Sequence, residues 1–271
     1  MGREAKEMTA NNDLQFLSEL LFQLADDDFI ISYRGSEWLG LAPHIEEDVA
    51  FSSISQDTMG HAAMFYQLLE DIGVGKVDDL AHSRTSTERK NAVLLELVNG
   101  PGNYLRQPQY DWAFAVVRNY FYTQAKKIRV ESLKTSSYQP LADVAVKVNM
   151  ELYYHLLHWK TWFTQLMMAG GDARTRMEKA VQTVVADFEG MLTLGPKGKE
   201  MAELGFIDTE EVLKTRTINA MKPIFESINL DFPSTFEMKN GNGRIGQHTA
   251  DLDDALSTLS EVYNINPVAT W

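Results

Sequence analysis

The sequence has 271 residues, 44% apolar and 23% charged, and a formal net charge of −13, so we expect a globular protein that does not bind nucleic acid, which requires a basic face. No apolar run reaches the roughly 18 residues of a membrane span, and MGREAKEMTANND lacks the apolar core of a secretory signal, so we expect a cytoplasmic protein. Cysteine is absent, which excludes disulfides, iron–sulfur clusters and thiolate metal sites and leaves carboxylates and imidazoles as metal ligands.

The first two predicted elements are long helices joined by a short turn. Apolar residues recur near helical spacing over residues 13–38, with Asn12 or Asp13 as the N-cap. The stretch LGLAPH then turns the chain. The second helix covers residues 45–72 and ends at Gly73, because glycine is favoured just past a helix C-terminus.

A second pair of long helices follows an irregular crossover. A short helix over residues 87–98 leads into NGPGNYLRQPQ, whose glycines and prolines break regular structure. The third long helix covers residues 110–133, SSYQP turns the chain, and the fourth covers residues 141–169. Further helices are predicted over residues 172–190, 209–228 and 249–263.

This order of elements predicts an all-α fold. Two antiparallel hairpins of long helices, joined by a long crossover, are typical of a ferritin-like four-helix bundle, here with extra C-terminal helices. The four helices are much longer than the mean of about 11–12 residues in globular proteins. No linker or low-complexity segment divides the chain, so we expect residues 1–271 to form a single ferritin-like domain, with residues 1–12 as a flexible N-terminus.

Two acid and histidine motifs lie on the second and fourth long helices. Asp57 precedes His61 by four residues, and Glu151 precedes His155 by the same spacing. Ferritin-like di-metal proteins place one glutamate on each of two helices and a Glu-x-x-His pair on each of the other two, all pointing inward. The motifs therefore indicate where a metal site would lie.

The two turns decide which positions of each hairpin lie level with one another. The first turn is centred near Pro43, which puts Asp28 level with Thr58, since both helices rise about 1.5 Å per residue. The second turn puts Thr123 level with Leu152. The lone acids of a di-metal site would fall at positions 28 and 123, and the acids of the Glu-x-x-His pairs at 58 and 152.

Three of the six ligand positions keep a group that can bind metal, and three do not. The first set is Asp28, His61 and His155, and the second is Thr58, Thr123 and Leu152. One carboxylate and two imidazoles can neither offset the charge of two iron ions nor bridge them, so we expect no metal, cofactor-binding or catalytic residue in this chain. A single weakly held ion is the alternative.

Asp57 and Glu151, the acids of the two motifs, do not replace the missing carboxylate ligands. A shift of one residue rotates a helical side chain by about 100°, which takes Asp57 and Glu151 off the inward face. We expect both acids beside the site, where each would orient a histidine through a hydrogen bond.

Two polar clusters admit a chemical interpretation. Lys126, Lys127 and Arg129 offer charge for a polyanionic cofactor, although a solvated helix face or the rim of an interface is the preferred interpretation. Serines at 52, 53 and 55 lie near the Asp57 and His61 motif and supply the residue types of a hydrolase. No strand and no nucleophile-elbow glycines accompany them, so this enzyme class is not expected.

Two aromatic-rich stretches offer a third alternative. They cover residues 119–123 and 153–163 and have the residue types that line a pocket for an aromatic substrate. At helical spacing, core packing or a partner interface is the preferred interpretation, with exposed portions of Trp159 and Trp162 suited to an interface.

Five stretches together are specific enough to indicate a known family: LADDDFIISYRGSEWLGLAPHIEEDVAF, QDTMGH, LVNGPGNYLRQPQYDWAFAVVRNYF, ELYYHLLHW and GRIGQHTADLDDALSTL. Through them, nearly the whole chain after residue 13 resembles the ferritin-like subunits of bacterial phenylacetyl-CoA 1,2-epoxidase, also called phenylacetate-CoA oxygenase, and within them the PaaC subunit family. The related catalytic subunit, PaaA, has a glutamate in each histidine motif where this chain has Thr58 and Leu152. PaaC chains are similar to it in fold, have a degraded metal site and support it as a structural partner.

The resemblance implies a structural, non-catalytic subunit of a multicomponent phenylacetyl-CoA monooxygenase in aerobic phenylacetate degradation. A PaaA-like subunit would hold the di-iron centre, other oxygenase components would join the complex, and a reductase with FAD and an iron–sulfur cluster would deliver electrons. A homodimer is a further expected assembly. The alternatives are a ferritin-like metalloprotein with its own oxygenase activity, ligated by His61 and His155, and a free-standing structural or storage bundle.

Overall fold

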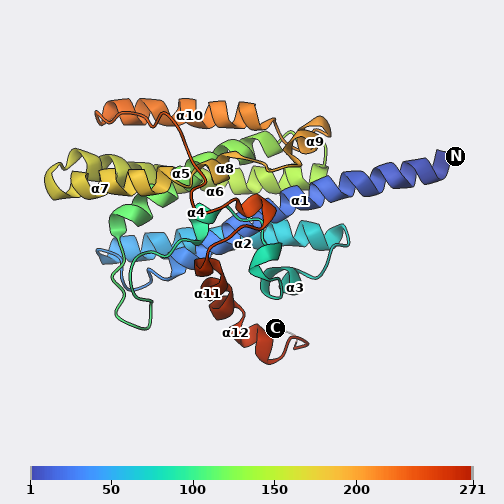
Figure 1. Ribbon diagram of the computed structural model, residues 1–271, viewed down its shortest axis with the longest axis horizontal. Helices are drawn as coiled ribbons and strands as arrows, with labels where there is room; N and C mark the ends of the chain where they lie inside the picture. The colour runs from blue at the N-terminus through green and yellow to red at the C-terminus, as the bar shows by residue number, and fades with distance from the viewer. Residues whose placement is uncertain (1, 270–271) are drawn as a thin grey trace.

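The computed structural model describes residues 2–269, with side chains from residue 13 onward (Figure 1). Within this range the chain forms twelve α-helices, two single-turn 3₁₀ helices and no β-strand, which confirms the predicted all-α class. None of the helices over residues 2–269 has both the length and the hydropathy that crossing a bilayer requires.

The first hairpin consists of α1 (Gly2–Ser36) and α2 (Ile45–Asp71). The bounds of α2 agree with the prediction. α1 begins at Gly2, well before the predicted cap at Asn12 or Asp13. Because the side chains of residues 2–12 lie outside the described residues, the flexible N-terminus stays a prediction.

The second hairpin consists of α5 (Trp112–Leu133) and α6 (Gln139–Met168), close to the predicted ranges. Asp111 caps α5 by accepting hydrogen bonds from two backbone N–H groups of its first turn. Nearly every side chain of α5 is buried, because α6, α7 and α10 all pack against it. Polar side chains of α5 therefore need partners in the interior of the protein.

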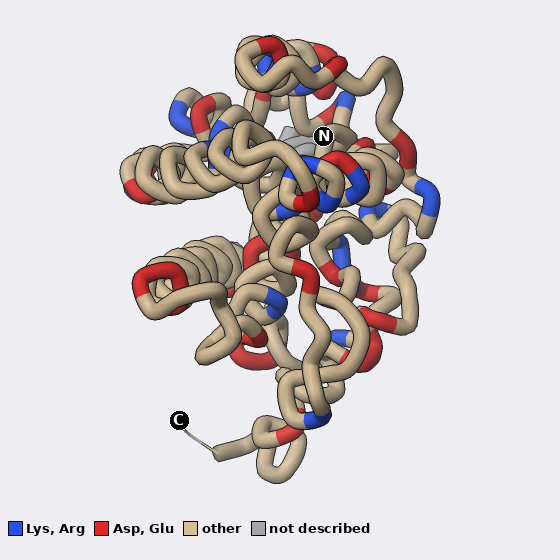
Figure 2. Tube along the Cα trace, turned by 90° about the vertical axis from the view of Figure 1, so that its left-hand side faces the viewer, with Lys and Arg blue, Asp and Glu red and all other residues tan. Residues whose placement is uncertain are grey.

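The remaining elements surround the two hairpins. In Figure 1 α10 lies on the far side of the second hairpin from the first, and α11 and α12 lie beyond the first hairpin. Acidic residues are spread along the whole trace with basic residues among them (Figure 2). The bounds are α3 Val77–His82, η1 Ser86–Glu88, α4 Val93–Glu96, α7 Gly171–Val185, α8 Glu189–Leu192, α9 Gly198–Glu203, α10 Glu210–Ser227, η2 Gly243–Ile245, α11 Ala250–Leu259 and α12 Glu261–Ile265.

The helix predicted over residues 87–98 is wrong in part, because only the single turns η1 and α4 form there. Between them the backbone N–H of Lys90 donates to Asp26 and that of Ala92 donates to Asp27, both at 2.8 Å. These N–H groups serve buried carboxylates of α1 and are not available to a helical ladder.

Three consecutive aspartates organise the interior around α1. Asp26, Asp27 and Asp28 are all buried, although successive positions of a helix point about 100° apart. α1 is therefore covered on several sides at this level. Each carboxylate must be neutralised by a different set of donors, since a buried unpaired charge is strongly destabilising.

The first two aspartates hold the crossover and the C-terminal segment against α1. Asp26 pairs with Arg84 and Arg89; burial alone would raise the pKa of Asp26, but the two guanidinium groups hold it at about 2. Asp27 accepts two hydrogen bonds from Arg244, at 2.9 and 2.8 Å, and lies 3.3 Å from Arg129. The stretch around Arg244 is thus fastened to the centre of the first hairpin.

Candidate functional site

All six ligand positions inferred from the sequence are buried. Four helices supply them, one position each from α1 and α5 and two each from α2 and α6. The residues are Asp28, Thr58, His61, Thr123, Leu152 and His155. The motifs and the hairpin register together therefore identified positions in the interior of the protein.

The centre of the site is the ammonium group of Lys126, for which the sequence favours a solvated face. Lys126 Nζ lies 2.7 Å from Asp28 Oδ2 and 2.9 Å from His61 Nδ1. The other oxygen of Asp28 accepts a hydrogen bond from the hydroxyl of Tyr122. A protein cation thus lies between two of the three retained ligand residues.

The interpretation of the basic cluster as a solvated face is wrong for two of its three members. Lys126 and Arg129 are buried, and only Lys127 is partly exposed. A signal for Lys126 was present in the sequence, because it lies three residues after Thr123 and positions three apart share a helix face. The burial of Arg129 had no such signal, since it depends on Asp27 of α1 and on the carbonyl of Thr193, which follows α8.

The contacts of His61 fix its tautomer. An ammonium group has three donors and no acceptor, so Lys126 donates to Nδ1 of His61. The ring proton then lies on Nε2, which donates to Glu151 Oε2 at 2.6 Å. Burial, and next the charge of Lys126, lower the pKa of His61 far below its usual range, so this ring is neutral in the folded protein.

The two acids of the motifs pair crosswise with the two histidines. Glu151 of α6 pairs with His61 of α2, and Asp57 of α2 pairs with His155 of α6 at 3.0 Å. The two rings lie 6.0 Å apart between their centroids. Each acid thus orients the histidine of the neighbouring helix and not the histidine of its own motif, which lies four residues further along the same helix.

Burial shifts the pKa of Glu151 and His155 as well. Burial, and then the nearby Asp57, raise the pKa of Glu151. Burial lowers the pKa of His155, against the hydrogen bond from its ring to Asp57. Burial is the first cause in both cases, because it disfavours the charged form of each group.

The residues present do not fit a di-iron centre. Asp28 is the only inward carboxylate among the six ligand positions, and both of its oxygens are occupied by Lys126 and Tyr122. The inward nitrogen of His61 is occupied by Lys126 as well. Within the described residues no group of three or more histidines and acids has the geometry of a metal site. A metal would have to displace an ammonium group that lies in a buried ion pair.

The space around this cluster is too small for a substrate. The cavity lined by Asp28, Tyr122 and Lys126 has a volume of about 10 Å³. A single water needs about 10–15 Å³ on the same measure. Side chains of α1, α2, α5 and α8 therefore close around the ion pair, and no aromatic acyl group fits beside it.

The aromatic stretches are divided between core and surface. Tyr120 stacks on Phe163 with ring centroids 4.7 Å apart, and both are buried. Tyr153 and Tyr154 are exposed on α6. Trp159 is fully buried, so the expected exposed portion of this side chain is wrong, whereas Trp162 is partly buried.

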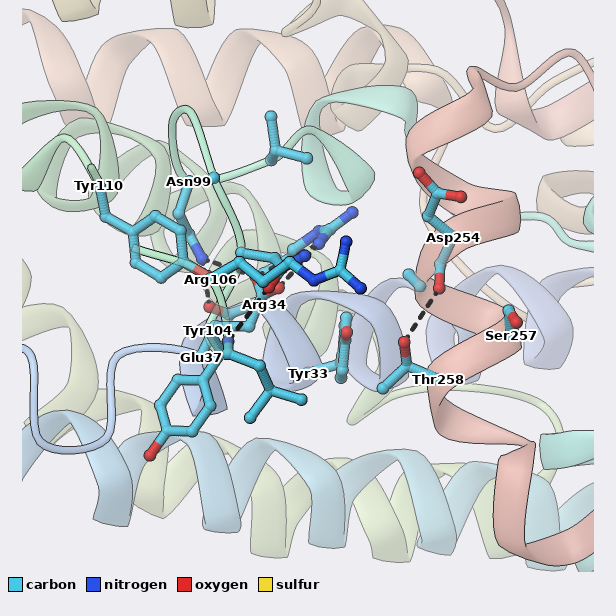
Figure 3. A pocket seen from close by; sticks show the side chains of 15 residues that line it. Tyr33, Arg34, Glu37, Asn99, Tyr104, Arg106, Tyr110, Asp254, Ser257 and Thr258 are labelled. Atoms are coloured by element: carbon cyan, nitrogen blue, oxygen red, sulfur yellow. Dashed lines mark hydrogen bonds and ion pairs between the residues drawn. The ribbon is translucent and has the colours of Figure 1, made fainter. Parts of the chain in front are cut away.

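A separate cavity of about 560 Å³ lies where the end of α1 meets the crossover loop and α11 (Figure 3). Figure 3 shows Asp254 and Thr258 of α11 across this cavity from Arg34 and Asn99. Arg34 is already engaged by Glu37 at 3.1 Å and by backbone carbonyls. None of the six ligand positions or the two motif acids lines the cavity, so it is not the counterpart of the predicted site.

The neutral histidines predict a loss of stability on acidification. Below about pH 6.5 a histidine takes up a proton in the unfolded chain, whereas a buried neutral histidine does not. For each such residue, the free energy of unfolding therefore falls by about 1.4 kcal/mol for each unit by which the pH is lowered. We expect the His61→Gln variant to lose correspondingly less stability than the native chain between pH 7 and pH 5.5. Urea denaturation at both pH values measures this.

The matched control is His44→Gln, because His44 is exposed on the turn between α1 and α2. This variant should keep the pH dependence of the native chain. If His61→Gln also keeps it, His61 is protonated in the folded protein and the tautomer assignment is wrong.

The chain matches the family described as phenylacetic acid catabolic protein over residues 1–271. It is similar to the C subunit of 1,2-phenylacetyl-CoA epoxidase from Escherichia coli (strain K12), with 25% identity over 261 residues. That similarity covers 94% of this chain and 99% of the relative. It therefore extends through both hairpins and the C-terminal segment.

Proposed function

This chain belongs to the family of phenylacetic acid catabolic proteins, and from that premise we propose that it is a structural, non-catalytic subunit of a multicomponent phenylacetyl-CoA epoxidase. The similarity to one subunit of such an epoxidase, over nearly the full length of both chains, supports the assignment. The pathway it serves in this proposal is phenylacetate degradation.

We also infer that α1, α2, α5 and α6 are the four helices of a ferritin-like bundle. Short turns join α1 to α2 and α5 to α6, and a long crossover connects the two hairpins. Each of the four helices contributes to the six ligand positions, and all six side chains are buried. This convergence on one level is what the ferritin-like arrangement requires.

The observation that carries the non-catalytic role is the buried ion pair between Lys126 and Asp28. The ammonium group supplies, from the protein itself, the positive charge that Asp28 needs in the interior. The same group occupies the inward nitrogen of His61. The positive charge in the cluster thus comes from the protein without a metal, and three of the four carboxylate positions, 58, 123 and 152, have no carboxylate.

The chemistry in this proposal belongs to other chains. A PaaA-like catalytic subunit holds the di-iron centre, and a reductase with FAD and an iron–sulfur cluster supplies the electrons. This chain packs against the catalytic subunit and fixes the position of its helices. The alternative, a metalloprotein with its own oxygenase activity, requires displacement of Lys126 and is disfavoured for that reason.

The test is co-expression with a di-iron catalytic subunit of the same system. We expect the two chains to co-migrate on size-exclusion chromatography, with iron in the partner and far less than one iron per copy of this chain when it is purified alone without chelator. With reductase and NADPH, a complex containing the His61→Ala chain should still turn over, because no metal depends on this histidine.

Two results would contradict the proposal. One is about two iron or manganese ions per copy of the isolated chain, as in a complete di-metal bundle. The other is a complex with the His61→Ala chain that assembles normally but has lost turnover completely.

A further inference from the structure

The outer face of α6 carries an apolar ridge. It consists of Val146, Met150, Tyr153, Tyr154 and Leu157, all exposed. Tyr154 leaves 69% of its surface accessible. Residues three, four and seven positions apart share a helix face, so these five side chains form one continuous strip. Large contiguous apolar surface of this kind is typical of a protein interface.

Beside the ridge, α2 presents small side chains. The crossed histidine and acid pairs place α2 alongside α6 at this level. Ser53 and Ala63 are exposed on α2, and Gly60 lies between them on the chain. A Cβ added to Gly60 meets no atom within 4 Å, so no contact inside this chain requires a glycine there. Gln56 and Met64, one turn to either side of Gly60, are larger, so the surface is low at Gly60 itself and high along α6, which suits the docking of another helix.

Two carboxylates lie at the foot of the ridge. The side chains of Asp57 and Glu151 are 42% and 46% exposed. Among the described residues neither makes an ion pair with lysine or arginine, and their histidine partners are neutral rings. Lys147, one turn before Glu151 on α6, is exposed at the edge of the ridge, so the acids outnumber the cation here. This part of the surface thus complements a partner that carries a cation among apolar side chains.

We propose that this face, the α6 ridge together with Ser53, Gly60 and Ala63 of α2, is the docking surface for a helix of the catalytic di-iron subunit that carries an arginine or lysine among apolar residues. The cation of that helix approaches Asp57 and Glu151, and its apolar side chains cover the ridge. This inference rests on the proposed function for the identity of the partner. The chemistry of the docking helix follows from the surface itself.

The test uses the full chain and the purified catalytic subunit. Gly60→Leu adds bulk where the docking helix would lie, and Tyr154→Ala removes the most exposed aromatic side chain of the ridge. Each variant should raise the Kd of the complex at least about 10-fold, the effect of losing a central interface residue. The melting temperature of the free chain should not fall with Gly60→Leu, because the position is open and leucine is the better helix former.

Matched controls carry the same changes elsewhere. Asn219→Leu adds a leucine to an exposed position of α10, and Tyr104→Ala removes an exposed tyrosine from the crossover loop. Both should leave the Kd at the native value. Added salt should weaken the native complex, since the carboxylates attract a cation.

Each other result has a distinct meaning. If the native chain binds and both ridge variants bind equally well, the docking surface is wrong while the proposed function stands. If the native chain forms a homodimer that Gly60→Leu dissociates, the surface binds a second copy and the inference is overturned. If the native chain does not bind the catalytic subunit at all, the proposed function fails, and the inference fails with it.

Discussion

Replacing Lys126 with methionine is expected to lower the free energy of unfolding by about 3–5 kcal/mol, the usual effect of removing one partner of a buried ion pair. Methionine has a similar length and volume, so the change removes the charge with little loss of packing. Asp28 would then be a buried carboxylate with only the hydroxyl of Tyr122 as a donor. Denaturation in guanidinium chloride at pH 7 measures the loss.

The neighbouring lysine provides the control. Lys127→Met removes a partly exposed ammonium that pairs with Glu131 one turn away, and such pairs contribute about 0.3–0.5 kcal/mol. A loss of similar size in both variants would mean that Lys126 is not part of a buried ion pair. The double variant of Lys126→Met with Asp28→Asn should recover much of the stability, because it removes both charges together.

The pH dependence of the Lys126→Met variant provides a second check. Burial raises the pKa of Asp28, so in the absence of the ammonium group this carboxyl takes up a proton more readily in the folded than in the unfolded chain. Stability contributed in this way is present at low pH and is lost as pH rises. The deficit relative to the native chain should therefore be smaller at pH 5 than at pH 8.

Replacing Arg244 with methionine is the second change with a large expected effect, again about 3–5 kcal/mol. Arg244 is fully buried and donates to both oxygens of Asp27, a geometry that a lysine does not reproduce. Its loss leaves Asp27 with Arg129 at 3.3 Å and the N–H of Ala92. It should also loosen the C-terminal segment, because this contact ties that segment to α1. Amide hydrogen exchange over residues 240–259 would detect the loosening.

A surface arginine provides the comparison. Arg176→Met on α7 removes an arginine that is 69% exposed and pairs with Asp172 one turn away, so its effect should be within about 0.5 kcal/mol. The prediction is contradicted if Arg244→Met unfolds at the same denaturant concentration as the native chain and if hydrogen exchange over residues 240–259 is unchanged. Arg244 would then not hold this segment in place.

The substitutions of Lys126 and Arg244 test two different parts of the structure. Lys126 tests whether a protein cation has taken over the electrostatic role at the centre of the four long helices. Arg244 tests whether the segment GRIGQHTADLDDALSTL, which contributes to the family resemblance, stabilises the first hairpin. His248 of the same segment contacts the buried Glu96 at 2.7 Å. The segment thus docks through two buried acids that lie far away in the sequence.

Much of the fold was accessible from local sequence patterns. The ranges of α2, α5, α6 and α10 follow from apolar spacing and from the turns that end each helix, because these signals lie within a few residues of the elements they define. The region 87–98 did not follow. There the backbone donates to Asp26 and Asp27 of a distant helix, and no local pattern contains that information.

The sequence by itself determined the four long helices and identified six positions on them that are buried, since apolar spacing, turn position and helical rise indicate which residues share a face. Only the tertiary structure decided which ions meet there: that Lys126 turns toward Asp28 and His61, that Glu151 and Asp57 pair across helices, and that Arg129 is buried. The physical reason is that periodicity identifies one face of a helix, whereas burial of its other faces depends on neighbours such as α7, α10 and the stretch around Arg244, which come from elsewhere in the chain.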